Sequence, residues 1–517
     1  MLLPSVRTAI VLCGPVANSP LQEPPERVTG GVRYSARDAA YFSRRALTRH
    51  ANVWHLWALG VGAVISGHFS GWNGGLLQGG WGGMLVATII VGVMYLGLTF
   101  AIAEMSAALP HTGAAYSFAR TAMGPWGGFL TGLAENVEYV LTPAVIVFFI
   151  GTYLTRLFGT PDSWQPLWWI AAYALFLTLN IRGVALSFRV TVIVTLLALG
   201  CLLVFWIAAI PRVEFARWAL DIGEGSRHLP EGHGPFLPNG WPGAFGSMPF
   251  AVWLFLAIEQ LPLAAEESID PSRDMPRGII AGFLTLVISA LAILALNPSL
   301  PGIGSFALGS SGEPLLDGFR AMFGEGLGRT LAVAAVLGLI ASFHTIIFAS
   351  GRQIFSLSRA GYFPTMLSVT HGRHRTPHVA MIAGSLVGLA VILVTWFLAG
   401  AERRGAVIGF TLLNMAVFGA MLSYVAQAVS FILLRRRHGD IARPFVSPIG
   451  IPGALATIVI AVATISFQLA GDATYRAGIV GVAVWFSVFV AYFALIGRHR
   501  LILSPEEEFA MQRSRAD

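Results

Sequence analysis

Long apolar runs recur along this chain and limit the folds that are open to it. A stretch of about 18 or more apolar residues is read as a membrane-spanning helix. Such runs lie at about residues 54–79, 83–109, 124–155, 165–181, 187–210, 244–264, 278–298, 329–357, 378–399, 405–434, 451–470 and 477–497. Charged residues make up only 11% of the chain, whereas soluble domains carry about 25%. The sequence therefore predicts an all-α polytopic membrane protein with about twelve transmembrane helices.

The placement of arginine predicts how these helices are oriented. Cytoplasmic loops of membrane proteins carry an excess of basic residues. Here arginines gather before the odd-numbered runs and after the last one, at Arg33, Arg37, Arg44, Arg45, Arg49, Arg120, Arg182, Arg273, Arg277, Arg359, Arg373, Arg375, Arg435, Arg436, Arg437, Arg443, Arg498, Arg500, Arg513 and Arg515. An even number of crossings puts all of them on one side, so both termini are predicted to be cytoplasmic. The net charge of +7 follows from this topology, and no nucleic-acid partner is expected. Glu266, Glu267 and Asp270 could pair with loop arginines.

Composition also excludes several kinds of chemistry. All 33 basic residues are arginine, so a nucleotide-binding, Schiff-base or general-base lysine is excluded. The two cysteines, Cys13 and Cys201, cannot form a disulfide framework, and no zinc-type spacing of Cys and His is present. We therefore expect no catalytic residues, no metal and no cofactor. One transporter-sized membrane domain over residues 51–500 accounts for the chain, with cytoplasmic tails at 1–50 and 501–517.

Two of the apolar runs contain residues that interrupt a helix. The first, WALGVGAVISGHFSGW (57–72), has Gly60, Gly62 and Gly67, and the sixth, GAFGSMPFAVWLFLAIEQLPLAAEES (243–268), has two prolines and Glu259. Interrupted helices in matching places of two halves indicate a transporter binding site, because an unwound turn exposes carbonyl and amide groups. Alternatively, the glycines only permit close packing of helices. The pair together favours a binding site.

Two acidic residues in the third run also indicate function. Glu135 and Glu138 lie three apart, so they share one helix face. An ionised carboxylate at the bilayer centre costs at least about 2.5–3.5 kcal/mol. One carboxylate could pair with the ammonium group of a substrate, while the other binds a proton. Alternatively, both bond to neighbouring helices or face water. The residues do not decide which of the two would touch the substrate.

Three stretches resemble the amino acid–polyamine–organocation transporter superfamily: AIAEMSAALPHTGAAYSFARTAMGPWGGFLTG (101–132), AEESIDPSRDMPRGI (265–279) and SGRQIFSLSRAGYFPTMLSVTHGRHRTPHVA (350–380). Within it, GLAENVEYVLTPAV (132–145) and LPHTGAAYSFARTAMGPWGG (109–128) are most similar to bacterial ethanolamine permeases. The resemblance implies a leucine-transporter-type fold of two inverted five-helix repeats, at 51–210 and 244–434, plus two helices at 451–497.

The resemblance also implies where a substrate would lie, namely between the broken first and sixth helices. The family's glycine-rich turn, which receives a carboxylate, matches Ser66, Gly67 and His68. His68 departs from the usual small residue, and its imidazole would suit the hydroxyl of an amino alcohol better than a carboxylate. The implied ammonium contacts are backbone carbonyls near Val64, Ile65, Trp253, Leu254 and Leu256.

Further candidates complete the expected site. Tyr139, Trp253, Phe255 and Phe343 could wall the cavity, where an aromatic ring attracts an organic cation by about 0.5–2 kcal/mol. Glu259 and His344 could gate the path or carry protons, although a structural hydrogen bond is an open alternative for each. Some relatives have a lysine in the fifth helix where this chain has Ala198, so coupling to protons would need another group.

These features predict a secondary transporter of the bacterial inner (plasma) membrane that imports a small organic amine, with ethanolamine as the leading substrate. An amino-acid or polyamine permease or antiporter of the same superfamily is the main alternative. A membrane enzyme acting on lipid head groups and an amine-sensing transceptor are two others. The lipid bilayer and a small amine are the expected partners, with protons as a candidate coupling ion.

Overall fold

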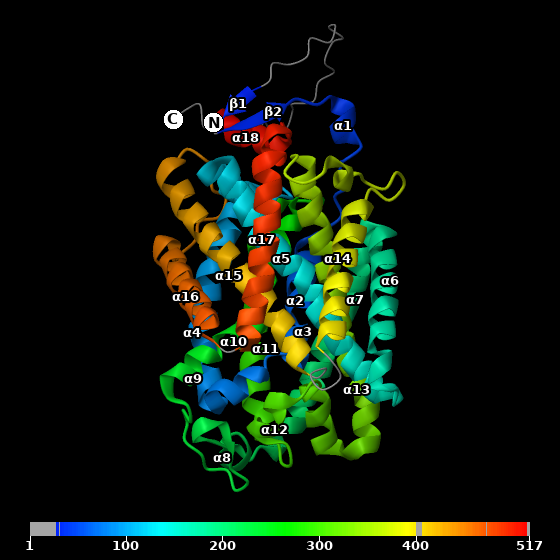
Figure 1. The fold of residues 1–517 in the computed structure, drawn as a ribbon, viewed down its shortest axis with the longest axis vertical. Coiled ribbons are helices and arrows are strands. Elements are labelled where there is room, and N and C mark those ends of the chain that lie inside the picture. Colours follow the sequence, from blue (N-terminus) through cyan, green and yellow to red (C-terminus); the bar gives the residue numbers. More distant parts are fainter. Residues whose placement is uncertain (1–26, 30, 400–405, 472, 514–517) are drawn as a thin grey trace, which may run out of the picture.

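The computed structural model describes residues 27–29, 31–399, 406–471 and 473–513. Most of the chain is a bundle of helices that run along its long axis (Figure 1). Both described ends of the chain lie at one end of this bundle, beside strands β1 and β2 and helix α18. We call this end the terminal face and the other end, which carries α8, α9 and α12, the opposite face. Two chain ends on one face agree with an even number of crossings.

Helices and strands follow one another in three groups. The first comprises β1 (Arg27–Thr29), β2 (Val32–Ser35), α1 (Ala39–Ser43), α2 (Val53–Val64), α3 (Ser66–Phe69), α4 (Gly74–Ala108), α5 (Ala114–Phe158), η1 (Asp162–Trp164), α6 (Gln165–Ile181), α7 (Val184–Ala209) and η2 (Ile210–Arg212). The second comprises α8 (Phe215–Trp218), β3 (Ile222–Gly223), η3 (Glu224–Ser226), β4 (Arg227–His228), α9 (Gly240–Gly246), α10 (Met248–Trp253), η4 (Ile258–Glu267), α11 (Pro271–Leu296), η5 (Asn297–Ser299), α12 (Gly304–Ser310), α13 (Pro314–Arg359), η6 (Thr365–Ser368), α14 (His378–Leu398) and α15 (Ala406–Arg437). The third comprises α16 (Gly450–Ala470), α17 (Ala473–Leu495), η8 (Gly497–His499), β5 (Leu501–Ile502) and α18 (Pro505–Arg513).

The helices overlap the predicted apolar runs, but some bounds were wrong. The first run (54–79) ends at Phe69, and its last residues belong to α4, which begins at Gly74 because no long polar loop separates the two helices. Ten segments of the described chain are long and apolar enough to cross a membrane, and Val53–Phe69 is a shorter apolar one. Helix α6 has 17 residues, which at 1.5 Å per residue reach about 26 Å. A hydrocarbon layer is about 30 Å thick, so α6 also fits a crossing. The all-α polytopic architecture is therefore confirmed.

Burial separates central segments from peripheral ones. Over an apolar stretch of 18 residues in each span, 89% of the residues are buried in α5 and 100% in Gly240–Glu267. The share is only 11% in Gly478–His499, which includes most of α17. Helix α5 packs against α13, α14 and α15. The third and sixth predicted runs, which carry the candidate acidic residues, thus lie inside the bundle rather than against lipid.

Short strands at the terminal face join the two ends of the chain, a feature that the sequence did not predict. Strand β2 pairs with β1 in antiparallel fashion and with β5 in parallel fashion, where Tyr34 is opposite Leu501. The backbone amide of Ile502 also donates to the carbonyl of Ala360 at the end of α13. Because these strands hold only two to four residues each, they have no period that a pattern search could detect.

Candidate functional site

The first broken helix is interrupted by a single residue between α2 and α3. Ile65 keeps near-helical angles (φ −60°, ψ −23°), so the break is a shallow bend. The Ser342 side chain of α13 lies beside it, where its hydroxyl accepts from the Ser66 amide (2.9 Å) and donates to the Gly62 carbonyl (2.7 Å). The Ser342 hydroxyl thus bonds to the Ser66 amide and to the Gly62 carbonyl next to the bend. Such backbone groups have no partner at an ordinary helix end.

The second broken helix is interrupted more strongly. Helix α10 ends at Trp253, Ala257 adopts a left-handed conformation (φ +80°), and the chain resumes as the 3-10 segment η4. A non-glycine residue rarely occupies this region. The hydrogen bonds around the break use the carbonyls of Ala251, Val252, Phe255 and Ala257. The sequence therefore correctly placed this break, and the carbonyls of Trp253, Leu254 and Leu256 lie within or beside it.

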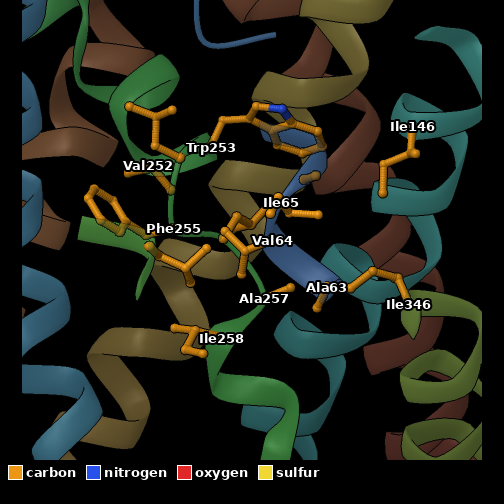
Figure 2. Close-up of a cluster of buried hydrophobic side chains, with 14 of the residues drawn as sticks. Ala63, Val64, Ile65, Ile146, Val252, Trp253, Phe255, Ala257, Ile258 and Ile346 are labelled. Carbon is orange, nitrogen blue, oxygen red and sulfur yellow. The ribbon is translucent and has the colours of Figure 1, made fainter. Parts of the chain in front are cut away.

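The two breaks are in direct contact. A Cβ added at Gly67 would lie 2.3 Å from the Trp253 carbonyl oxygen, so only glycine allows α3 to approach α10 this closely. The Trp253 indole also donates to the Ser70 carbonyl (3.0 Å). Figure 2 shows Val64 and Ile65 of the first break among Trp253, Phe255 and Ala257 of the second. The segments that were predicted to bind substrate thus meet in the buried centre of the bundle.

Beside this contact lies a cluster of acidic side chains, formed by Glu135, Glu138 and Glu259. All three are at most 2% exposed, and Glu259 is in electrostatic contact with both others. By strict bond geometry, both carboxyl oxygens of Glu135 and of Glu138, and one of Glu259, lack a hydrogen-bond partner. Glu138 nevertheless lies within reach of Glu259 and Tyr424, and Glu135 within reach of Tyr139. No ion pair between described residues reaches any of the three. The three carboxyl groups of this acidic cluster are therefore buried, and none of the described ion pairs supplies a basic partner to them.

Tyrosine hydroxyls border the acidic cluster. The Tyr139 hydroxyl donates to Glu259 (3.4 Å), and the hydroxyls of Tyr95 and Tyr424 are 3.0 Å apart. Phe255 packs on the Tyr95 ring, with centroids 5.3 Å apart. The sequence pointed to Tyr139 and Phe255 but missed Tyr95 and Tyr424, because each is a lone polar group in an apolar run.

The two candidate histidines differ in their surroundings. His68 is fully buried and both its ring nitrogens lack a hydrogen-bond partner. His344 instead bonds to Asn180 of α6 (3.0 Å) and Ser187 of α7 (3.1 Å). Phe343, beside it, packs on Tyr173. His344 thus has the surroundings of a structural histidine, and its suggested part in proton transfer stays a prediction.

Gln260 ties the second break to the first broken helix. Its side-chain amide donates to the Leu59 carbonyl of α2 (3.2 Å). Tyr153 of α5 donates to the Phe69 carbonyl at the end of α3 (2.8 Å). The helix that carries Glu135 and Glu138 is therefore bonded to one broken segment and reaches the other through Tyr139.

Buried ion pairs close the bundle at the terminal face. Arg352 forms a two-bond pair with Glu267 (2.7 and 3.0 Å), and both side chains are fully buried. Arg359 bonds to Glu266 (2.6 Å) and also to Glu506 of α18. The expected pairing of Glu266 and Glu267 with arginine is present, but the partners come from α13 rather than from a loop. Glu506 was missed because the sequence PEEEF reads as a solvated tail.

Comparison with known proteins gives the family. The model of the amino acid permease family matches residues 52–496. This chain belongs to the amino acid permease family. A branched-chain amino acid permease from Bacillus subtilis is 24% identical over 435 residues, which are 80% of this chain and 86% of that protein. A methylthioribose transporter from the same organism is 23% identical over 427 residues, or 79% of this chain and 86% of that protein.

A solved structure supports the same assignment at the level of the fold. A mutant form of a manganese transporter from Eremococcus coleocola superimposes with a TM-score of 0.50 at 13% identity, covering 91% of this chain and 98% of that one. The leucine-transporter-type fold that the sequence predicted is thereby confirmed. Membership of the amino acid permease family is a coarser statement than a resemblance to ethanolamine permeases, and it does not select a substrate.

Proposed function

We propose that this amino acid permease family member is a secondary transporter that carries a small organic amine, with ethanolamine as its leading substrate. The substrate would bind between the break at Ile65 and the break at Leu254–Ala257, and alternating access would expose this site to each side in turn. The terminal face would be cytoplasmic, because the arginine-rich loops belong to it. The membrane would be the bacterial inner membrane.

The observation that supports this proposal is the uncompensated acidic cluster of Glu135, Glu138 and Glu259. Buried charges are paired in stable proteins, because an unpaired one loses its hydration without return. These carboxylates have no basic side chain bonded to them in the described chain. A cationic amine, protons or both would supply the missing positive charge. Binding of a cation would therefore stabilise this region.

The residues near the first break favour a substrate without a carboxylate. The ring of His68 is buried next to the backbone of Ile65 and Leu286, and neither of its nitrogens makes a strict hydrogen bond. A ring nitrogen that turned toward the site would bond a hydroxyl, which suits an amino alcohol. A substrate that carried a carboxylate would bring a further acidic group next to those of the acidic cluster, which disfavours its binding. The Trp253 and Phe255 rings and the carbonyls of Leu254 and Leu256 would complete the pocket around the ammonium group.

An amino acid is the second candidate, and the relatives supply the reason. One relative is a branched-chain amino acid permease. Another is a transporter of methylthioribose, which is not an amino acid, so the family leaves the chemical class open. In the amino-acid case, the α-carboxylate would lie at the turn of Ser66, Gly67 and His68, where it would have to displace the Ser342 hydroxyl from the Ser66 amide.

Uptake into liposomes that contain the purified protein would test the proposal. Radiolabelled ethanolamine is the substrate, and unlabelled choline, agmatine, alanine and leucine are the competitors. The proposal expects ethanolamine uptake that alanine and leucine do not reduce. Uptake of leucine with no ethanolamine uptake would reject the amine in favour of an amino acid. Repeating uptake with an imposed pH gradient would tell whether protons move with the substrate.

A further inference from the structure

A polar cavity lies at the opposite face, apart from the acidic cluster. Its volume is about 360 Å³. Its walls come from the end of α5, from η1, the start of α6, the end of α12 and the start of α13, and they include Arg156, Asp162, Gln165, Ser310, Glu313 and Asp317. We call it the peripheral cavity. Two stretches that are far apart in the sequence, residues 148–165 and 307–317, thus converge on one polar hollow.

The charged groups of the peripheral cavity are mostly acidic. Glu313 is only 8% exposed, and its carboxylate pairs with Arg156 (3.2 Å), whose side chain is 57% exposed. Asp317 accepts from the Ser311 hydroxyl (2.5 Å) and lies 3.4 Å from Arg320. Asp162 adds a third carboxylate to the wall. Since Arg156 reaches in from solvent on a flexible side chain, a bound cation could replace it.

One buried acceptor in this wall has no partner. Gln165 is 6% exposed, and its side-chain oxygen makes no hydrogen bond. A buried polar atom without a partner costs about 1–3 kcal/mol, so a donor that enters the cavity would recover this loss. An ammonium group has three N–H donors and no acceptor, which matches a wall of two carboxylates and an amide oxygen.

The floor of the peripheral cavity is bonded to the first broken helix. The Ser70 hydroxyl, just after α3, donates to the Gly312 carbonyl (2.7 Å). The Asn73 side chain donates to the carbonyls of Leu308 (2.6 Å) and Ser311 (2.8 Å). A ligand in the cavity would therefore touch the same loop that holds α3 in place.

We propose that the peripheral cavity is a second binding site, which takes the ammonium group of a primary amine between Glu313, Asp317 and the Gln165 side-chain oxygen. The statement that the bound amine is also the transported substrate rests on the proposed function. The binding site itself does not. The ammonium would displace Arg156 from Glu313. Because Ser70 and Asn73 join the floor to the first break, an occupied peripheral site would bias the position of α3.

Equilibrium binding of radiolabelled ethanolamine to the purified full-length protein tests this site. Wild type is expected to bind two molecules per chain. The pair Glu313→Gln and Asp317→Asn should weaken one of them about tenfold, which is about 1.4 kcal/mol. Arg156→Gln should tighten the same one several-fold, since it removes the competing cation. Glu325→Gln is the matched control, because Glu325 is on the same helix, pairs with Arg320 and is 75% exposed.

A labelling experiment separates failure of this site from failure of the proposed function. Ser310, at the exposed rim of the peripheral cavity, is changed to cysteine in a background with Cys13→Ser and Cys201→Ala. A methanethiosulfonate reagent that carries an ammonium should react several-fold faster than one that carries a sulfonate. Glu313→Gln with Asp317→Asn should remove this preference. A preference that persists in this double variant, or two unchanged ethanolamine sites, would overturn the proposal. If ethanolamine does not bind at all but the double variant still loses the labelling preference, the peripheral site stands. Only the choice of ethanolamine as the transported amine is then rejected.

Discussion

The guanidinium of Arg120 lies 2.5 Å from the carboxylate of Glu507, although 387 positions separate the two residues in the sequence. Glu507 is fully buried and also accepts from the hydroxyls of Tyr34 (2.7 Å), Tyr116 (2.7 Å) and Tyr362 (2.9 Å). Arg120 in turn donates to Tyr34 (3.0 Å). One carboxylate on the C-terminal helix α18 thus joins β2, α5 and the end of α13. Glu507 therefore joins the Arg352–Glu267 and Arg359–Glu506 pairs in holding the terminal face together.

Glu507→Gln should lower the thermal stability of the protein markedly. The amide still accepts hydrogen bonds, but the buried Arg120 loses its counter-charge. Removing one partner of a buried ion pair costs about 3–5 kcal/mol. The measurement is the unfolding midpoint in detergent. Glu508→Gln is the matched control, because Glu508 is the next residue of α18 and is exposed. Equal midpoints for the two variants would contradict the role given to Glu507.

Gly67→Ala should abolish transport, because the new Cβ would lie 2.3 Å from the Trp253 carbonyl oxygen. Backbone cannot turn away as the end of a flexible side chain can, so α3 and α10 must separate. Gly200→Ala is the control, since nothing lies within 4 Å of a Cβ there, and alanine is favoured over glycine in a helix by about 1 kcal/mol. Uptake in liposomes and the amount of folded protein are measured for both. Wild-type uptake by Gly67→Ala would show that the close approach is not required.

The sequence predicted the helices well and the closed terminal face poorly, for physical reasons. Length and apolarity decide where a chain crosses a membrane, and both can be read locally. Glycine and proline likewise marked both breaks. Glu507, by contrast, lies in a charged stretch that reads as a solvated tail, and only partners from three distant elements make it buried. Tyr95 and Tyr424 were missed for the same reason, since their contact joins α4 to α15.

The candidate binding site was predicted in part. Glu135 and Glu138 stood out because a carboxylate in an apolar run is costly wherever it lies. Their closeness to Glu259 depends on the crossing of α5 and η4, which no local pattern contains. Trp253 was expected to line a cavity, but its indole bonds to Ser70. That bond accompanies the close approach of α3 and α10 at Gly67, which residue types alone do not specify.

Substitutions in the acidic cluster should separate the transported cation from a structural role. Glu138→Gln and Glu135→Gln each replace a carboxyl group by an amide of the same size, which cannot ionise. If the cluster binds an ammonium, at least one of them should weaken ethanolamine uptake by about tenfold or more, since a hydrogen bond to a charged group contributes about 1.5–3 kcal/mol. Asn136→Asp is not a suitable control because Asn136 bonds to Gln353. Glu325→Gln, exposed at the opposite face, is the suitable one. Full uptake by both cluster variants would contradict the proposed binding role.

Stability should fall as pH rises through the range set by Glu313. Burial, and next the neighbouring Asp317, raise the pKa of Glu313 from its ordinary value of 4.5 to about 7, against the opposing effects of Arg156 and Arg320. Below pH 4.5 the group is protonated in both folded and unfolded chains. Between pH 4.5 and 7 the unfolded chain ionises first, so stability decreases with rising pH. The total effect is at most roughly 3 kcal/mol.

The unfolding midpoint, measured at intervals from pH 5 to pH 8, would detect this decrease, and Glu313→Gln should reduce it while Glu325→Gln should not. Binding in the peripheral cavity should change in the opposite direction. A primary ammonium stays protonated over this range, whereas the Glu313 carboxyl gains its negative charge, so ethanolamine should bind there more tightly at pH 8 than at pH 6. The same protein would then lose stability when empty and recover it when ethanolamine is added. Identical pH profiles for wild type and Glu313→Gln, with and without ethanolamine, would show that Glu313 neither titrates in this range nor binds the amine.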